Sequence, residues 1–273
     1  MCGSFIEAVH FATHCDDIVA FSTMRDLGAA ASYDNGGGSD SYARFNVCNY
    51  TGDAPGHVVE CRGELCAALG IAADHLIMPR QTHSSRVAII DTEFLALDDA
   101  SRSERLQGID ALVTTLCGVA VGVNTADCVP LLLRDVATGA IGVAHAGWKG
   151  TVARIAARTV EAMQQLGAEP SRIEVAIGPS ICPQCFEVGD EVVEQFAAAG
   201  FPIDAIVHRD AVTGKAHINL WEANATALIE AGVQRRKLTL THRCTRCNPS
   251  RYFSARRLGI ASGRIFTTIL RRR

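Results

Sequence analysis

Residues 119–150 read VAVGVNTADCVPLLLRDVATGAIGVAHAGWKG and give the strongest indication of the fold class. They hold three apolar runs of strand length, at residues 119–123, 131–133 and 141–144. A parallel connection between strands needs a crossover of about a dozen residues or more. The segments between these runs are shorter, so we expect consecutive runs, such as 119–123 and 131–133, to pair as antiparallel strands.

Outward from this stretch, strand and helix signals alternate along the chain. Apolar runs predict further strands at 76–78, 87–90, 111–113, 173–177, 238–241 and 265–270. Helical patterns predict helices at 58–69, 151–166, 189–199 and 220–231, with Gly70 and Gly167 as stops. The segment 34–41 is rich in glycine and serine and predicts a surface loop. This order favours one α+β domain with a mixed sheet over a doubly wound parallel sheet.

The composition bounds the class of protein. The chain has 273 residues, 48% of them hydrophobic and 20% charged, which suits one globular domain over residues 1–273. The net charge of −3 gives no basic surface for a nucleic acid. We expect no signal peptide, since no basic segment is followed by an apolar run, and no membrane span. With 11 cysteines and no export signal, we expect free thiols in a reducing compartment and a cytoplasmic protein.

Three polar segments follow predicted strands, at residues 79–84, 124–130 and 144–150. They contain His83, Cys128 and His145. Strand ends hold side chains rigidly, and two imidazoles with a thiolate suit Zn²⁺. Three protein ligands would leave a fourth position for water, as in catalytic zinc sites. The spacing is no standard metal motif, so the alternative of a hydrogen-bonded histidine and a core cysteine stays open.

Two Cys-x-x-Cys pairs lie elsewhere, at Cys182 and Cys185 and at Cys244 and Cys247. Cys185 and Cys244 are 59 positions apart, far more than the roughly 15–20 residues of a zinc ribbon. The separation predicts that these pairs do not form a second metal site.

Six motifs in order resemble the YfiH-like family, also called the laccase-domain or multicopper polyphenol oxidase family. They are Gln81 with His83, the segment 108–114, the segment 126–130, the segment 145–150, the residues 178–181 with 186–188, and Cys244-Thr245 with 252–257. The resemblance implies packed mixed β-sheets flanked by helices. It also implies a purine nucleoside phosphorylase that acts on adenosine, inosine and related nucleosides and that deaminates adenosine, with methylthioadenosine phosphorylase activity. The metal ligands that it implies are His83, Cys128 and His145, holding one zinc ion per chain.

Phosphorolysis requires a site for phosphate beside the sugar, and deamination requires activated water. The candidate phosphate-binding residues are Lys149, Arg256, Arg257, Arg62 and Arg25. If Arg256 and Arg257 lie in a strand, only one of them can face the site. Asp127 adjoins a proposed ligand, so it is a candidate proton donor or a hydrogen-bond partner of a ligating histidine.

Three other readings remain open at this point. The first is a copper-dependent polyphenol oxidase, although the chain has 9 histidines and no His-x-His pair. The second is a metal-free hydrolase in which Cys128 is the nucleophile and His145 the base. The third is a binding module with a structural zinc ion, which a chelator would unfold.

Overall fold

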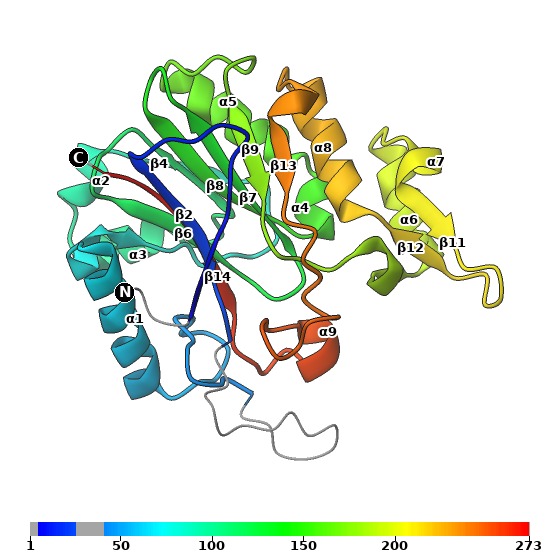
Figure 1. The fold of residues 1–273 in the computed structure, drawn as a ribbon, viewed down its shortest axis with the longest axis horizontal. Helices are drawn as coiled ribbons and strands as arrows, with labels where there is room; N and C mark the ends of the chain where they lie inside the picture. The colour runs from blue at the N-terminus through cyan, green and yellow to red at the C-terminus, as the bar shows by residue number, and fades with distance from the viewer. Residues whose placement is uncertain (1–4, 26–40, 273) are drawn as a thin grey trace.

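Two large β-sheets lie face to face at the centre of the molecule (Figure 1). The computed structural model describes residues 5–25 and 41–272. The first sheet has the strand order β1 (Ile6–Ala8), β2 (Ile18–Thr23), β14 (Ile265–Arg271), β6 (Ala120–Thr125) and β3 (Leu76–Ile77). The second has the order β13 (Leu238–Leu240), β9 (Glu174–Ile177), β7 (Val129–Asp135), β8 (Ala140–Ala146), β5 (Ala111–Thr114) and β4 (Val87–Ile90).

Strand β7 shows why the sheets stack. Successive side chains on a strand point to opposite faces, and all seven residues of β7 are buried. Leu132 belongs to the apolar cluster between the sheets, together with Val121 of β6. Leu131 and Leu133 belong to the cluster on the other face of their sheet. A strand that is apolar on both faces therefore requires cover on both sides.

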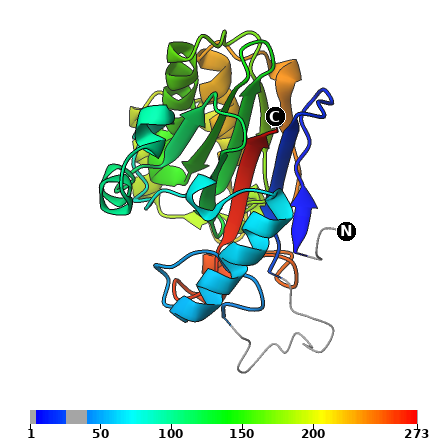
Figure 2. The ribbon, with the colours of Figure 1, turned by 90° about the vertical axis from the view of Figure 1, so that its left-hand side faces the viewer.

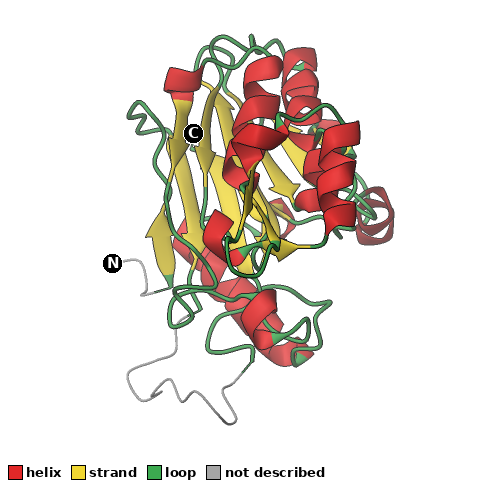
Figure 3. Cartoon of the chain, turned by 90° about the vertical axis from the view of Figure 1, so that its right-hand side faces the viewer, coloured by secondary structure: helices red, strands yellow, loops and turns green. Residues whose placement is uncertain are grey.

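Helices supply the outer cover. On the second sheet, α5 (Ile155–Gln165) and α8 (Leu220–Glu230) pack against β7 and β8 through the apolar cluster that contains Met163 and Leu228. Figure 3 shows helices, in red, beside the yellow strands. On the first sheet, α1 (Pro55–Leu69) packs Leu65 with Phe21 and Phe266, and Figure 2 shows α1 on that side. The order of layers is helix, sheet, sheet, helix.

The smaller elements lie around these layers. A third sheet of β10 (Glu187–Val188), β12 (Ala216–Ile218) and β11 (Val207–Arg209) stands at one end with α6 (Asp190–Ala198) and α7 (Ile203–Ile206) (Figure 1). The others are α2 (Thr92–Leu95), α3 (Asp99–Arg105), α4 (Trp148–Val152), α9 (Ala255–Leu258) and the 3₁₀ turns Ala73–His75, Pro183–Cys185 and Arg235–Lys237. Within the described ranges, no helix is both long and apolar enough to cross a membrane.

The expected α+β class with packed mixed sheets and flanking helices is confirmed. The second sheet mixes parallel pairs, β13 with β9 and β4 with β5, with antiparallel pairs such as β7 with β8. Every predicted strand appears within a few residues of its expected bounds. The predicted loop at 34–41 lies outside the described residues, apart from Ser41.

Two expectations are wrong. The runs at 119–123 and 131–133 do not pair, because β6 and β7 belong to different sheets and the chain crosses between the sheets at residues 126–128. The predicted helix 151–166 is two helices, α4 and α5, separated at Arg154, whose φ is 61°. The Arg154 guanidinium donates to the Ala199 carbonyl and lies 3.8 Å from the Phe201 ring centroid, so tertiary contacts outweigh the local helical pattern.

Candidate metal centre

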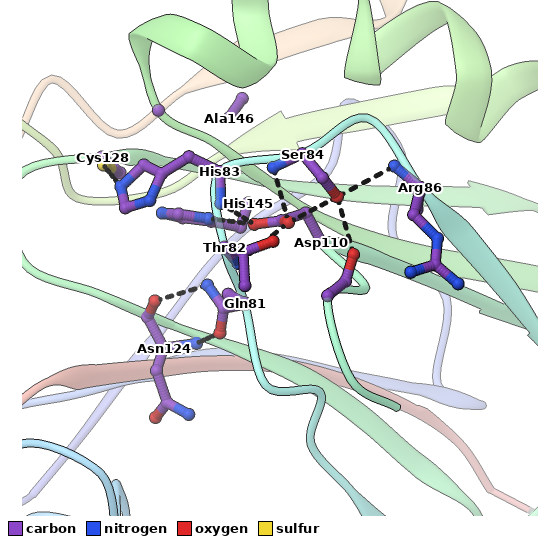
Figure 4. Close-up of polar contacts among 12 residues, drawn as sticks. Gln81, Thr82, His83, Ser84, Arg86, Asp110, Asn124, Cys128, His145 and Ala146 are labelled. Atoms are coloured by element: carbon purple, nitrogen blue, oxygen red, sulfur yellow. Dashed lines mark hydrogen bonds and ion pairs between the residues drawn. The ribbon is translucent and has the colours of Figure 1, made fainter. Parts of the chain in front are cut away.

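His83, Cys128 and His145 converge where the chain passes between the two sheets (Figure 4). One ligand atom from each lies within 4.8 Å of the others. The Cys128 sulfur is 3.7 Å from His83 Nε2, and the two imidazole centroids are 4.8 Å apart. Cys128 directly precedes β7, while His145 lies inside β8, opposite Pro130 of β7. The antiparallel β7–β8 pair therefore brings two of the three side chains together.

The third side chain comes from a loop held by one buried carboxylate. Asp110 accepts hydrogen bonds from the backbone N–H groups of Thr82, His83 and Ser84, at 3.1, 3.0 and 2.7 Å (Figure 4). The Ser84 hydroxyl also donates to it, at 2.7 Å. His83 has a φ of 61°, which a residue other than glycine rarely adopts. The bonds to Asp110 offset the strain of this conformation.

Gln81 links the same loop to strand β6. Its side chain donates to the Asn124 carbonyl at 2.8 Å and accepts from the Asn124 N–H at 2.7 Å (Figure 4). The side-chain amide of Gln81 thus makes the two hydrogen bonds to the Asn124 backbone that a neighbouring strand would make. It fixes the loop two residues before His83.

Asp110 also orients His145, since one of its oxygens lies 2.8 Å from His145 Nδ1. Burial alone would raise the pKa of Asp110, but the hydrogen bonds and the charge of His145, followed by the bonds from Ser84, hold it below its usual range. An ionised carboxylate can only accept, so Nδ1 carries the proton and Nε2 is left to bind a metal. This role of Asp110 was not predicted from the sequence, although Asp110 lies inside the motif at residues 108–114.

The electrostatics favour the thiolate form of Cys128. Burial by itself would raise the pKa of this thiol, but the charge of and hydrogen bond with His145, and then His83, lower it to about 6. Burial likewise opposes protonation of His145, while the charge of Cys128 and the bond to Asp110 raise its pKa to about 9. Without a metal ion the pair is therefore a thiolate beside an imidazolium at neutral pH. A bound metal would use the thiolate and displace the Nε2 proton of His145.

The absence of a side chain at Gly147 leaves space for the side chains of Cys128 and His83. A Cβ atom added at this position would lie 2.8 Å from the Cys128 sulfur and 2.8 Å from His83 Cδ2. The φ of Gly147 is −68°, so its backbone conformation would admit other residues, and only the contacts exclude a side chain. The donor set and this clearance together fit a metal ion.

Asp127 serves the loop rather than a histidine. Its φ is 92°, and its two carboxylate oxygens accept from the Thr245 hydroxyl at 2.6 Å and the Arg256 N–H at 2.7 Å. The carboxylate that contacts a ligating histidine is Asp110, so Asp127 does not take that expected part. Its bonds hold the segment that carries Cys128 against the C-terminal part of the chain.

The predicted phosphate-binding residues have unequal positions. Lys149 is exposed on α4, four residues beyond His145, with its ammonium 5.5 Å from the Trp148 ring centroid. Arg256 and Arg257 are exposed on α9, which is a helix. They are therefore not strand neighbours that must point to opposite faces, as the sequence had suggested. The Arg256 backbone N–H donates to Asp127 at 2.7 Å, and its guanidinium donates to the Glu187 carbonyl at 3.0 Å.

The other two arginines are more enclosed. Arg25 is buried, donates to the Pro249 carbonyl at 2.9 Å and stacks on Phe253. Arg62 donates to the Val47 carbonyl at 2.8 Å and lines a cavity of ≈ 380 Å³ next to Asn124. Among the described residues, the lining of this cavity does not include His83, Cys128 or His145. Lys149 follows a candidate metal ligand by four residues, and the backbone of Arg256 is bonded to the segment that carries Cys128.

The fold and the site define a four-layered α+β protein with a two-histidine, one-cysteine cluster between its sheets. A family model described as multi-copper polyphenol oxidoreductase laccase matches residues 28–272. The chain belongs to this family, as the resemblance of its motifs implied.

Individual relatives agree with this assignment. The chain is 49% identical over 267 residues to adenosine deaminase RL5 from an unknown prokaryotic organism, covering 98% of this chain and 99% of that protein. It is 40% identical over 231 residues to a purine nucleoside phosphorylase of Bacteroides thetaiotaomicron, covering 84% and 86%. The crystal structure of YlmD from Geobacillus stearothermophilus superposes with a TM-score of 0.82 at 30% identity, covering 94% and 93%.

Proposed function

We propose that this protein is a zinc-dependent enzyme of purine nucleosides. It would deaminate adenosine and cleave adenosine, inosine and methylthioadenosine with phosphate. The observation that carries the proposal is the cluster of His83, Cys128 and His145, with His145 oriented by Asp110. The names of relatives that match nearly the whole chain support the substrate class. We further propose that residues 1–273 work as one catalytic domain.

Zinc fits this donor set better than a multicopper centre does. Two imidazoles and one thiolate are common zinc ligands, and three protein ligands are typical of catalytic zinc. Oxidases with several copper ions need many more histidines in paired motifs, and this chain has 9 in total. The chemistry that zinc supplies in such a site is activation of water near neutral pH. The ten described cysteines are free, which favours a reducing compartment, and we propose the cytoplasm.

The chain's own residues prepare both reactions. In deamination, water adds to C6 of the purine and ammonia leaves, so a proton must reach the departing nitrogen. Asp127 is our candidate for handling that proton, because it adjoins Cys128 in the chain. In phosphorolysis, phosphate attacks C1′ of the sugar while the purine leaves protonated at a ring nitrogen. We propose that Lys149 and Arg256 hold the phosphate, with Arg257, Arg62 and Arg25 as further candidates.

Product analysis tests the substrate class. Metal-analysed protein is incubated with adenosine, inosine or methylthioadenosine, with and without phosphate, and the products are separated chromatographically. We expect inosine from adenosine without phosphate, and free base with sugar 1-phosphate when phosphate is present. Oxidation of a phenol by copper-loaded protein, with no turnover of any nucleoside, would show that the proposal is wrong.

One observation favours a second candidate, a metal-free cysteine hydrolase. The thiol with a pKa of about 6 beside His145, whose pKa is about 9, resembles a nucleophile and base pair. Alkylation of Cys128 by iodoacetamide separates the two candidates. Zinc protects a bound thiolate, so we expect labelling to be slow and to accelerate after chelation, whereas a free catalytic thiolate labels fast in both conditions.

A further inference from the structure

Four cysteines that are far apart in the sequence meet at one place in the fold. Cys182, Cys185, Cys244 and Cys247 have their sulfur atoms within 4.8 Å of one another. The Cys185 and Cys247 sulfurs are 3.4 Å apart, and the Cys182 N–H donates to the Cys244 sulfur at 3.3 Å. The long separation along the chain, on which the prediction against a second metal site rested, does not keep the two pairs apart.

The topology explains why they meet. Strands β9 and β13 are parallel neighbours, with Ile177 opposite Leu240, so the segments that follow them leave the sheet at the same edge. These segments stay paired beyond the sheet, because the Ser180 N–H donates to the Arg243 carbonyl at 3.0 Å and the Thr245 N–H to the Ser180 carbonyl at 3.2 Å. A zinc-ribbon spacing rule assumes that both cysteine pairs lie in neighbouring hairpins. In this protein the parallel pairing of β9 and β13 brings the two cysteine pairs close together.

The local geometry suits one tetrahedral ion. Each pair occupies a tight turn, closed by a bond from the Cys185 N–H to the Cys182 carbonyl at 3.0 Å and from the Asn248 N–H to the Cys244 carbonyl at 3.2 Å. Four sulfurs at ~2.3 Å from a zinc ion would be about 3.8 Å apart, which agrees with the observed cluster. The Arg246 guanidinium lies 3.5 Å from the Cys185 sulfur and partly balances the charge of four thiolates.

We propose that Cys182, Cys185, Cys244 and Cys247 bind one structural zinc ion, separate from the metal at His83, Cys128 and His145. Four cysteine ligands leave no position for water, so the site is closed, as structural zinc sites are. All ten described cysteines are free, so none of these four sulfurs is already used in a disulfide.

The position of this second ion gives it a consequence for the first site. One cysteine segment donates the Ile181 N–H to the Asp127 carbonyl at 2.9 Å, and the other donates the Thr245 hydroxyl to the Asp127 carboxylate at 2.6 Å. Asp127 immediately precedes Cys128. An ion that joins the two segments therefore holds the Cys128 loop from both sides, and its loss would loosen the first site.

Metal analysis of four proteins tests the proposal. Wild type, Cys128→Ala, Cys247→Ser and Cys117→Ser are purified with reductant from cells grown in zinc. Cys247 is exposed, so its replacement disturbs packing least, and Cys117 is an exposed cysteine outside both clusters and serves as the matched control. We expect two zinc ions per chain in wild type and in Cys117→Ser, and one in each of the other variants.

X-ray absorption on Cys128→Ala provides a readout that does not depend on the folding of Cys247→Ser. The remaining zinc should show four sulfur neighbours at about 2.3 Å and no nitrogen neighbours. A zinc-free Cys128→Ala protein, nitrogen neighbours around its zinc, iron in place of zinc, or a disulfide within the cluster in the reduced protein would each overturn the proposal. These outcomes are metal contents and zinc neighbours, so failure of this proposal can be distinguished from failure of the proposed nucleoside chemistry.

Discussion

Replacing Gly147 by alanine should disable the candidate metal centre while leaving the fold intact. The added Cβ would lie 2.8 Å from both the Cys128 sulfur and His83 Cδ2, whereas ordinary contact begins at 3.4 Å. One or both side chains must therefore move by about 0.6 Å. Zinc sites hold their ligand distances to about 0.2 Å, so a movement of this size removes a ligand or distorts the site.

The expected loss is about 100-fold in zinc affinity, at the upper end of what changes around metal ligands cost. Alanine tolerates the backbone angles of Gly147, so the variant should keep a cooperative unfolding transition. Gly63→Ala is the matched control, since a Cβ there meets nothing within 4 Å and lies in helix α1. This control should bind zinc normally and be slightly more stable, by about 0.5–1 kcal/mol.

The assay is competition for zinc with a fluorescent chelator, combined with thermal unfolding of the metal-free proteins. If the second zinc site exists, Gly147→Ala and Gly63→Ala are each combined with Cys247→Ser. Only the site at His83, Cys128 and His145 is then titrated. Wild-type affinity in Gly147→Ala would refute the reasoning, because the clearance at Gly147 would then have no part in metal binding. Unfolding of the metal-free variant would instead show that the glycine serves packing.

Three further predictions follow from the same contacts. Asp110→Asn removes the charge that orients the histidine of β8, and it should lower zinc affinity by roughly 10–100-fold in the same competition assay. Lys149→Ala should raise the apparent KM for phosphate by roughly tenfold to a hundredfold, the loss of one charged contact, with its zinc content unchanged; an unchanged KM would contradict the assignment of Lys149 as a phosphate ligand. Burial would raise the pKa of Glu174, but hydrogen bonds, above all from Arg134 at 2.9 Å, lower it. The ionised Glu174 side chain therefore stabilises the fold above its unfolded pKa near 4.5, and this stabilisation is lost as the pH falls through the lower pKa of the folded state. Glu174→Gln should therefore cost about 3 kcal/mol in urea unfolding at pH 7 and progressively less as the pH falls below the unfolded pKa, and a cost independent of pH would show that the charge does not matter.

The sequence was sufficient for features that depend on local chemistry. The apolar runs predicted the strands β5 to β9 because a strand buried on both faces needs continuous apolar side chains. The residue types alone pointed to His83, Cys128 and His145 as a zinc-like donor set, and the structure places these side chains together. The resemblance to the family rested on six motifs in the same order, since the spacing of the three ligands is not a standard metal motif.

Other features depended on which segments the fold brings together. Strand β6 joins β14, which lies more than 100 residues later in the chain, rather than its neighbour β7, since the apolar layer between the sheets needs strands from both. No local pattern shows that Arg154 breaks a helix to reach Ala199.

The same distinction applies to the polar groups. The sequence placed a carboxylate at Asp127 beside a ligand, but tertiary structure gave the contact with His145 to Asp110, 35 residues away. Tertiary structure also brings Cys185 next to Cys247, 62 residues away in the sequence, because the parallel strands β9 and β13 end on the same side of their sheet. Residue type sets which atoms can bind a metal or a proton, and it can be read from the sequence. Which of those atoms come within a few ångströms of one another is decided by strand pairing, which acts between segments that the sequence keeps far apart.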